Sequence, residues 1–282
     1  MQKIKKADIV KKIGTELKIQ GKSERTVRNY VYYNLDFLKF IGKQPKQVTT
    51  DDIKSYLAFR LTDKGNDPAT VALARSALRF FYDEVLKRKI TADIKTPKKQ
   101  RKLPEVLTKQ EVRDLIKNTD NLRDKLLIEF MYSSGLRVAE CVGLKKKDLN
   151  IPDKTGLIRR GKGGKDRFFI LSDKLIQDLN DYIPAVDKTK ADYLFPGRKS
   201  NSSISVRHAQ KIVHKAASEA GIKKKVYCHL LRHAFATHLL ESGTDIRLIQ
   251  ELLAHSNLQT TQFYTTVSTK QLKKVRSPLD VL

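Results

Sequence analysis

Residues 229–267 read HLLRHAFATHLLESGTDIRLIQELLAHSNLQTTQFYTTV and are the most informative part of this 282-residue chain. The stretch holds four of the six histidines, together with Arg232 and Tyr264. His229 and Arg232 are three positions apart, so on a helix they share one face. Helix packing alone does not require so many reactive side chains in one segment. The stretch is therefore the first candidate for a functional site, carried on helices.

The composition points to a polyanionic partner. The chain has 57 lysines and arginines against 31 acidic residues, a net charge of +26 with a pI near 9.9, and the basic residues occur throughout. Such a charge favours double-stranded DNA or another nucleic acid as the partner. The alternative is a surface on which lysine is simply the common polar residue.

Two cysteines, Cys141 and Cys228, each lie in an apolar, helix-like run, so we expect no disulfide framework and a reducing cytoplasm. The N-terminus lacks the apolar run of a signal peptide, and no stretch approaches eighteen apolar residues. We therefore expect a cytoplasmic, nucleoid-associated protein without a membrane span. The high lysine content is also compatible with a thermophilic or archaeal source.

The length favours two domains, and residues 1–95 read as a helical one. From Ser23 on, apolar residues recur at helical spacing and form one apolar stripe. The segment TTDDIKSYLAFRL predicts another helix with a second apolar stripe. After a break at GNDP, ATVALARSALRFFYDEVLK predicts one long helix. The first stripe comprises Val27, Tyr30, Val31, Leu35, Leu38 and Ile41, and the second Ile53, Tyr56 and Leu57.

Residues 96–104, TPKKQRKLP, form a basic, proline-flanked linker, so the second domain is expected to span residues 105–282. Thr108 and Glu111 have capping-box spacing, which predicts a helix start. Residues 157–171 predict a β-hairpin around a glycine-rich turn, and helices resume at SVRHAQKIVHKAASEAG. The predicted fold is mainly α with a small β-sheet, and the second domain is mixed α/β.

Several chemistries fit poorly. His229, His233 and His238 do not form a zinc set, because Leu230 stands where an HExxH pattern needs glutamate and no ligand completes the group. GKGGKD is not a phosphate-binding Walker loop, because Arg159 and Asp166 replace required residues. A serine or cysteine nucleophile also fits poorly, because no GxSxG motif occurs and neither cysteine lies in an electropositive setting. We therefore expect no metal and no cofactor.

One set of residues is suited to binding and cleaving a phosphodiester. Two arginines can bind the nonbridging oxygens, and two histidines can donate hydrogen bonds or move a proton. A lysine can protonate a leaving alkoxide, and a tyrosine hydroxyl can form a phosphoester. Each residue alone also has an ordinary structural reading, as a packing tyrosine, a surface lysine, a helix-capping histidine or an arginine paired with Glu140. The candidates are Arg137, Arg232, His229, His255, Lys162 and Tyr264.

The order of these segments resembles the tyrosine recombinase (phage integrase) family, and within it the Xer group. The similarity covers nearly the whole chain and implies a helical, SAM-like core-binding domain before a catalytic domain. YSSGLRVAECVGLKKKDL is similar to the family's first arginine box, and GKGGKDR to its hairpin lysine. HLLRHAFATHLL is similar to its H-x-x-R box, and LAHSNLQTTQFYTTV to its nucleophile box.

The resemblance implies a role for each candidate. Tyr264 would attack the phosphate to give a 3′-phosphotyrosyl link, Lys162 would protonate the leaving 5′ oxygen, and Lys165 is its rival. The two arginines would bind the phosphate, His229 would manage the tyrosine proton, and His255 would hydrogen-bond the phosphate. Glu140 would support the arginine box. Ala254 and Thr266 depart from the usual glycine and histidine, which affects only helix packing and tyrosine placement.

The resemblance also implies a homo-tetramer on two DNA duplexes that resolves chromosome dimers at an inverted-repeat, dif-like site during cell division. A DNA translocase or second recombinase remains an open requirement. The tail ending in SPLDVL would suit a pocket on a neighbouring protomer, with folding back onto its own domain as the alternative. Other functions left open are a viral or mobile-element integrase, a type IB topoisomerase and a DNA-binding protein with an inactive site.

Overall fold

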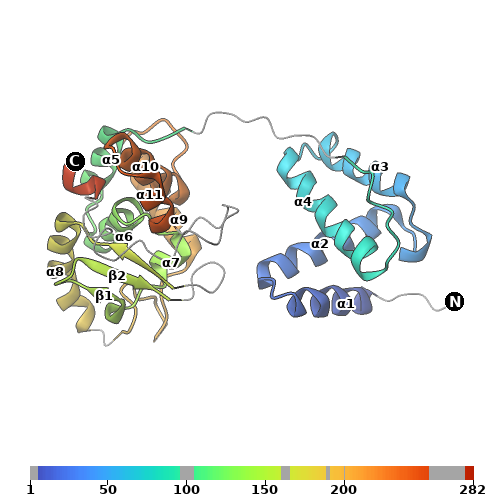
Figure 1. Ribbon diagram of the computed structural model, residues 1–282, viewed down its shortest axis with the longest axis horizontal. Helices are drawn as coiled ribbons and strands as arrows, with labels where there is room; N and C mark the ends of the chain where they lie inside the picture. The colour runs from blue at the N-terminus through green and yellow to red at the C-terminus, as the bar shows by residue number, and fades with distance from the viewer. Residues whose placement is uncertain (1–5, 96–104, 160–165, 189–190, 200, 254–276) are drawn as a thin grey trace. The chain divides into compact units, whose positions relative to one another are not determined.

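The computed structural model describes residues 6–95, 105–159, 166–188, 191–199, 201–253 and 277–282. The chain divides into two compact units, Met1–Leu103 and Pro104–Leu282, which are described separately. Both units are mainly helical, and the second also carries a small antiparallel sheet (Figure 1). The predicted fold class, mainly α with a small β-sheet, is confirmed. The predicted linker, residues 96–104, lies outside the described residues.

The first unit is a bundle of helices joined by short turns. Thr49 caps one of them by accepting a hydrogen bond from the backbone N–H of Asp52, whose side chain accepts one from Thr49 in return. Asp67 and Pro68 begin the next helix. The elements are α1 (Lys6–Ile19), α2 (Glu24–Ile41), η1 (Pro45–Gln47), α3 (Thr50–Leu61), α4 (Pro68–Arg79) and η2 (Phe80–Val85).

The predicted helix α2 forms, but the side chains it buries most deeply differ from the predicted stripe. Tyr33, Asn34 and Phe37 are buried, whereas the six predicted apolar residues are only partly covered. Asn34 can occupy the core because its amide donates to the Ala77 carbonyl of α4 at 2.9 Å. A buried hydrogen bond to another helix has no signature in apolar spacing. The second predicted stripe, on α3, is buried as expected.

The single long α-helix predicted after GNDP is shorter than expected and ends in a π-helical turn. Helix α4 stops at Arg79, and a π-helical turn, η2, continues the chain. The backbone N–H of Leu86 donates to the Phe81 carbonyl at 2.9 Å, the wider spacing of a π turn. This turn buries three consecutive aromatic side chains, Phe80, Phe81 and Tyr82.

The second unit packs helices around a central helix and a small sheet. Strands β1, β2 and β3 are antiparallel in that order, so the predicted hairpin is confirmed and gains one short strand. Gly156 is required on β2, because a Cβ there would lie 2.1 Å from the Phe169 ring of β3. The elements are α5 (Lys109–Lys117), α6 (Leu122–Ser133), α7 (Val138–Val142), η3 (Lys146–Asp148), β1 (Leu149–Asn150), β2 (Thr155–Ile158), β3 (Arg167–Ile170), α8 (Asp173–Asp187), α9 (Val206–Glu219), α10 (Cys228–Glu241), α11 (Ile246–Leu253) and η4 (Pro278–Val281).

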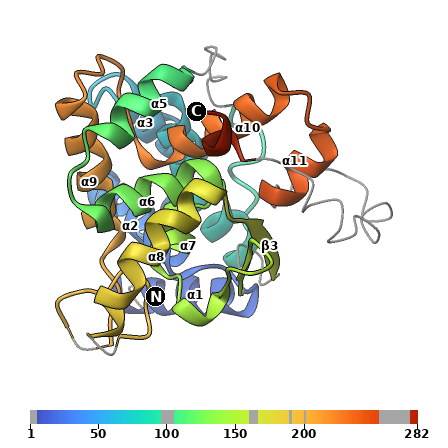
Figure 2. The ribbon, with the colours of Figure 1, turned by 90° about the vertical axis from the view of Figure 1, so that its left-hand side faces the viewer.

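Helix α6 is the centre of this unit and is buried from Leu126 to Ser133. It contacts α5, α7, α8, α9, α10 and η4, and it lies among them in Figure 2. The predicted capping box of α5 is present, with Thr108 and Glu111 exchanging hydrogen bonds. A central helix with apolar residues on every side fixes the loop that follows it, which carries the first arginine box.

The described end of the tail, residues 277–282, packs onto its own unit. The Ser277 hydroxyl donates to the Ser133 carbonyl at 2.9 Å, and the Leu279 side chain is buried. Arg113 donates to the final residue, Leu282, at 2.9 Å. In this single chain, residues 277–282 therefore pack against their own unit.

Candidate active site

The first arginine box begins with a glycine turn after α6. Gly135 has φ of +60°, and a Cβ on it would lie 2.5 Å from the Phe235 ring and 2.9 Å from the Leu253 side chain. The left-handed backbone and the close approach both require glycine. This turn directs the chain so that Arg137 becomes the N-cap of the short helix α7.

Arg137 and Glu140 form a closed pair at the start of α7. The Arg137 backbone N–H donates to Glu140 Oε2 at 2.8 Å, and its guanidinium Nη1 donates to Oε1 at 2.7 Å. Burial alone would raise the pKa of the Glu140 carboxyl, but Arg167 and the Arg137 hydrogen bonds hold it below its usual value. Glu140 is therefore ionised at neutral pH and fixes the orientation of the Arg137 guanidinium.

Arg232 lies on α10 and is only 2% exposed. Its Nη1 donates to the Gly135 carbonyl at 2.6 Å, its Nη2 donates to the Leu253 carbonyl, and its Nε has no acceptor among the described residues. Burial, followed by the like charges of Arg137 and Arg167, lowers the pKa of Arg232 to about 9. The group is still cationic at neutral pH, and an anion would relieve this repulsion.

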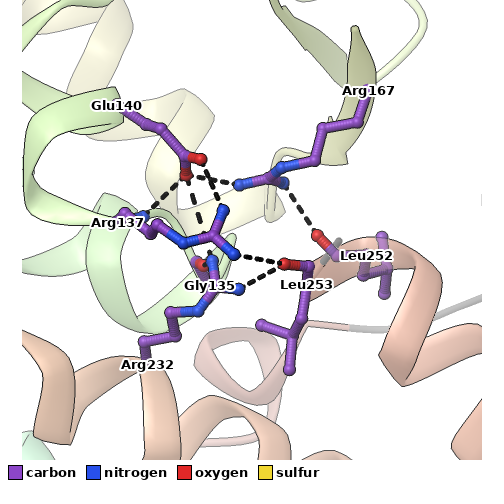
Figure 3. A network of polar contacts seen from close by, with 7 residues as sticks. All are labelled: Gly135, Arg137, Glu140, Arg167, Arg232, Leu252 and Leu253. Carbon is purple, nitrogen blue, oxygen red and sulfur yellow. Dashed lines mark hydrogen bonds and ion pairs between the residues drawn. The ribbon is translucent and has the colours of Figure 1, made fainter. Parts of the chain in front are cut away.

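The C-terminal end of α11 is the point where these side chains meet (Figure 3). The Leu253 carbonyl accepts from Arg232 and from Arg137 Nη2, the latter at 3.3 Å. The Leu252 carbonyl accepts from Arg167 at 2.7 Å. The last carbonyls of a helix lack partners within the helix and carry partial negative charge, so they attract cations. Both predicted arginines, Arg137 and Arg232, therefore converge on one oxygen atom.

Arg167 is a member of this cluster that sequence reasoning missed. It is the first residue of β3, and its Nη2 donates to Glu140 Oε2 at 2.5 Å. Alternation along the strand could have identified it, because Arg167 is on the same face as the wholly buried Phe169. An arginine on the buried face of a strand needs acidic or carbonyl partners.

The histidines of α10 separate into two groups. The rings of His229 and His233 are in edge contact, with centroids 4.5 Å apart. Burial lowers the pKa of His229, and the charges of Arg232 and Arg137 are among the groups that lower it further, so His229 adjoins the arginine cluster as a neutral imidazole. His238 lies elsewhere, with its Nδ1 3.0 Å from the Tyr132 hydroxyl in the core.

Four of the sequence candidates, Lys162, Lys165, His255 and Tyr264, lie outside the described residues. Within the described ranges, the structure brings Arg137, Arg232 and Glu140 together.

In those same ranges, no group of three histidine, cysteine or acidic side chains could hold a metal ion. None of the described helices is long and apolar enough to span a membrane.

Comparison with known proteins supports the sequence resemblance. Residues 105–271 match the phage integrase family, and residues 9–92 match the SAM-like N-terminal domain of phage integrases. The chain belongs to the phage integrase family. It is 38% identical to the tyrosine recombinase XerA of Pyrococcus horikoshii, over 97% of this chain and 94% of that protein. It is 35% identical to XerD of Oceanobacillus iheyensis, over 90% and 91% of the two chains.

Solved structures of this family share the architecture. The crystal structure of XerA recombinase aligns with a TM-score of 0.53 at 29% identity, covering 95% of this chain and 96% of that one. XerH bound to difH substrate before cleavage aligns with a TM-score of 0.71 at 24% identity, covering 96% and 84%, which shows a shared fold. This phage integrase family member is a tyrosine recombinase of the Xer group, an enzyme that cleaves and rejoins DNA.

Proposed function

We propose that this recombinase cleaves and rejoins DNA strands through a 3′-phosphotyrosyl intermediate, with Arg137 and Arg232 binding the scissile phosphate. The observation that carries the proposal is the convergence of both guanidiniums on the Leu253 carbonyl. Two planar donors directed at one oxygen are also the arrangement needed to bind the oxygens of a phosphodiester. Arg232 Nε, which has no acceptor among the described residues, is a further donor on the same guanidinium.

In the proposed reaction, the Tyr264 hydroxyl oxygen attacks the phosphorus and the bond from phosphorus to the 5′ oxygen breaks. The DNA 3′ end becomes a phosphotyrosyl ester, and Lys162 gives its proton to the leaving 5′ oxygen. His229 takes or directs the tyrosine proton, for which a neutral imidazole is suited. The two arginines and His255 stabilise the pentacoordinate transition state. Rejoining is the reverse, with a 5′ hydroxyl as the nucleophile.

The proposed biological reaction is resolution of chromosome dimers at an inverted-repeat, dif-like site by a tetramer on two duplexes. The support is similarity to XerA and XerD over almost the full length of both chains, and a shared fold with a XerH–difH complex. The proposed location is the nucleoid, in a reducing cytoplasm, consistent with two buried free cysteines. A translocase or second recombinase is a further partner that the same reaction would allow.

Integration of a mobile element is the alternative reaction. The integrase of mycobacterium phage Brujita aligns at 23% identity, which carries the fold alone. In sequence, Pyrococcus horikoshii XerA matches at 38% over nearly equal lengths, and a putative integrase/recombinase of Sinorhizobium fredii matches at 33%, which favours the Xer function.

The test is covalent trapping in EDTA on a randomised library of nicked duplexes, in which cleavage releases a short fragment and prevents rejoining. Wild type and Tyr264→Phe are compared, and trapped DNA is sequenced. We expect 3′-linked adducts on an inverted-repeat sequence with wild type and none with Tyr264→Phe, although Tyr264→Phe still binds that DNA. Adducts on every sequence would indicate a topoisomerase-like enzyme, and adducts with Tyr264→Phe would exclude this nucleophile.

A further inference from the structure

Arg167 links two parts of the active site that come from distant segments. Through Nη2 it contacts Glu140 Oε2 at 2.5 Å, and Glu140 in turn holds Arg137. Through Nη1 it contacts the Leu252 carbonyl at 2.7 Å, at the end of α11. Tyr264 follows α11 in the chain, so one guanidinium contacts both the phosphate-binding box and the helix leading to the nucleophile (Figure 3).

We propose that Arg167 is a positioning residue for DNA cleavage, which holds the C-terminal end of α11 at a fixed distance from the Glu140–Arg137 pair. The inference rests on the function proposed above. Arg167 acts through these groups, since its two terminal nitrogens are engaged by Glu140 and Leu252, while its buried Nε has no acceptor among the described residues. Its role is to keep the segment carrying the nucleophile in register with the arginines that hold the phosphate.

The geometry requires arginine rather than any cation. The two acceptors, a carboxylate oxygen and a main-chain carbonyl, are contacted by two different nitrogens of one planar group. Lysine has a single nitrogen on a flexible stem and would compensate the Glu140 charge without holding both acceptors in one geometry. The side chain is also enclosed, since Arg167 is only 9% exposed, so solvent cannot replace either hydrogen bond.

A purely structural role gives a different expectation. Glu140 is a buried carboxylate in contact with Arg137 and Arg167, and removing a buried charge partner destabilises a fold. If Arg167 served only to compensate that charge, any cation at position 167 would restore both stability and reaction rate. The positioning role predicts that Arg167→Lys has nearly the stability of wild type but cleaves DNA slowly.

The experiment measures adduct formation in single turnover at saturating DNA, using the nicked duplex recovered from the trapping selection. Arg167→Lys is expected to keep its DNA dissociation constant and thermal midpoint near the wild-type values. We expect its cleavage rate to fall on the order of 100-fold, as for a reacting group displaced by about 1 Å. Faster amide exchange in α11 than in wild type should accompany the slow rate. A cleavage rate within about threefold of wild type would overturn the proposal.

Arg60→Met is the matched control. Arg60 is also 9% exposed and pairs with a carboxylate, Asp36, at 2.9 Å, but it lies in the first unit. Its loss should lower stability without slowing cleavage of bound DNA. A rate as slow as that of Arg167→Lys would mean that loss of a buried arginine anywhere slows the enzyme, which would also overturn the proposal.

A double variant decides the question if Arg167→Lys does not fold. Glu140→Gln/Arg167→Met removes the Glu140–Arg167 ion pair as a whole, and it is compared with Glu140→Gln alone, in which Arg137 and Arg232 have lost the same carboxylate. We expect the double variant to cleave about tenfold more slowly than the single one, because the bond to Leu252 is also lost. Equal rates would show that the contact with α11 contributes nothing. Wild type that forms no adduct would instead refute the proposed function itself.

Discussion

Arg232 and Gly135 are joined by a hydrogen bond of 2.6 Å across 97 positions of the sequence. The donor is a buried guanidinium on α10, and the acceptor is the carbonyl of the glycine turn that precedes Arg137. Arg232 of the H-x-x-R box is therefore held by the backbone of the first arginine box. The relative placement of Arg137 and Arg232, the two arginines proposed to bind the phosphate, depends on the conformation of one glycine.

Gly135→Ala should lower both stability and cleavage. The left-handed backbone costs roughly 1–2 kcal/mol for a residue with a Cβ, and overlap with the Phe235 ring adds about 1–3 kcal/mol. Gly221→Ala is the matched control, because its φ is +65° and no atom lies within 4 Å of the new Cβ. Urea denaturation should show the larger loss for Gly135→Ala. Equal losses would mean that the close approach to Phe235 is unimportant.

Arg232→Ala should lose cleavage and part of its affinity for DNA. The substitution removes a buried cation and leaves the Gly135 and Leu253 carbonyls without their donor. By analogy with removal of one charge-stabilising donor, we expect the single-turnover rate to fall about 10²–10³-fold. Lys215→Ala, at a 77% exposed side chain on α9, should cleave at the wild-type rate. An Arg232→Ala rate near that of wild type would remove this residue from the proposed mechanism.

Glu129→Gln should change how stability depends on pH. Glu129 is wholly buried on α6, and burial together with the nearby Asp178 raises its pKa to about 8. The folded protein keeps this proton up to about pH 8, whereas the unfolded chain releases it near the ordinary value of 4.5. The free energy of unfolding should therefore fall as pH rises through that window.

Urea titrations at several pH values test this expectation. Glu129→Gln should flatten the dependence and be more stable than wild type above pH 8. The matched control is Glu219→Gln, whose half-exposed side chain pairs with Lys215 and should leave the wild-type dependence in place. A wild-type slope that persists in Glu129→Gln would show that another group causes it.

Leu279→Ala tests whether the tail occupies its own unit in solution. Leu279 is buried in the core of the second unit, so its truncation should cost about 2–5 kcal/mol of unfolding free energy. With the tail folded back, that cost should not depend on protein concentration. A thermal midpoint that rises steeply with wild-type concentration would instead indicate a tail exchanged between copies.

The sequence by itself predicted the helical first unit, the capping of α5 by Thr108 and Glu111, the hairpin and the family. These features are local, because capping boxes, strand–turn–strand patterns and apolar spacing are encoded within a few residues. It also selected Arg137 and Arg232, and the structure brings their guanidiniums to one carbonyl. Helix α8, which has a proline at position 184, was not anticipated.

Other features were decided only by tertiary structure. Asn34 is buried in the core because a carbonyl of another helix accepts its amide hydrogen, and Arg167 belongs to the arginine cluster because Glu140 and Leu252 converge on it from other elements. None of these partners is near in sequence. Strand alternation can place Arg167 on the buried face, but no spacing rule identifies its contacts with Glu140 and Leu252 or the buried position of Asn34. The sequence determined which chemical groups this recombinase has. Folding decided which of them share a buried, low-dielectric environment, where a few ångströms determine how strongly charges interact.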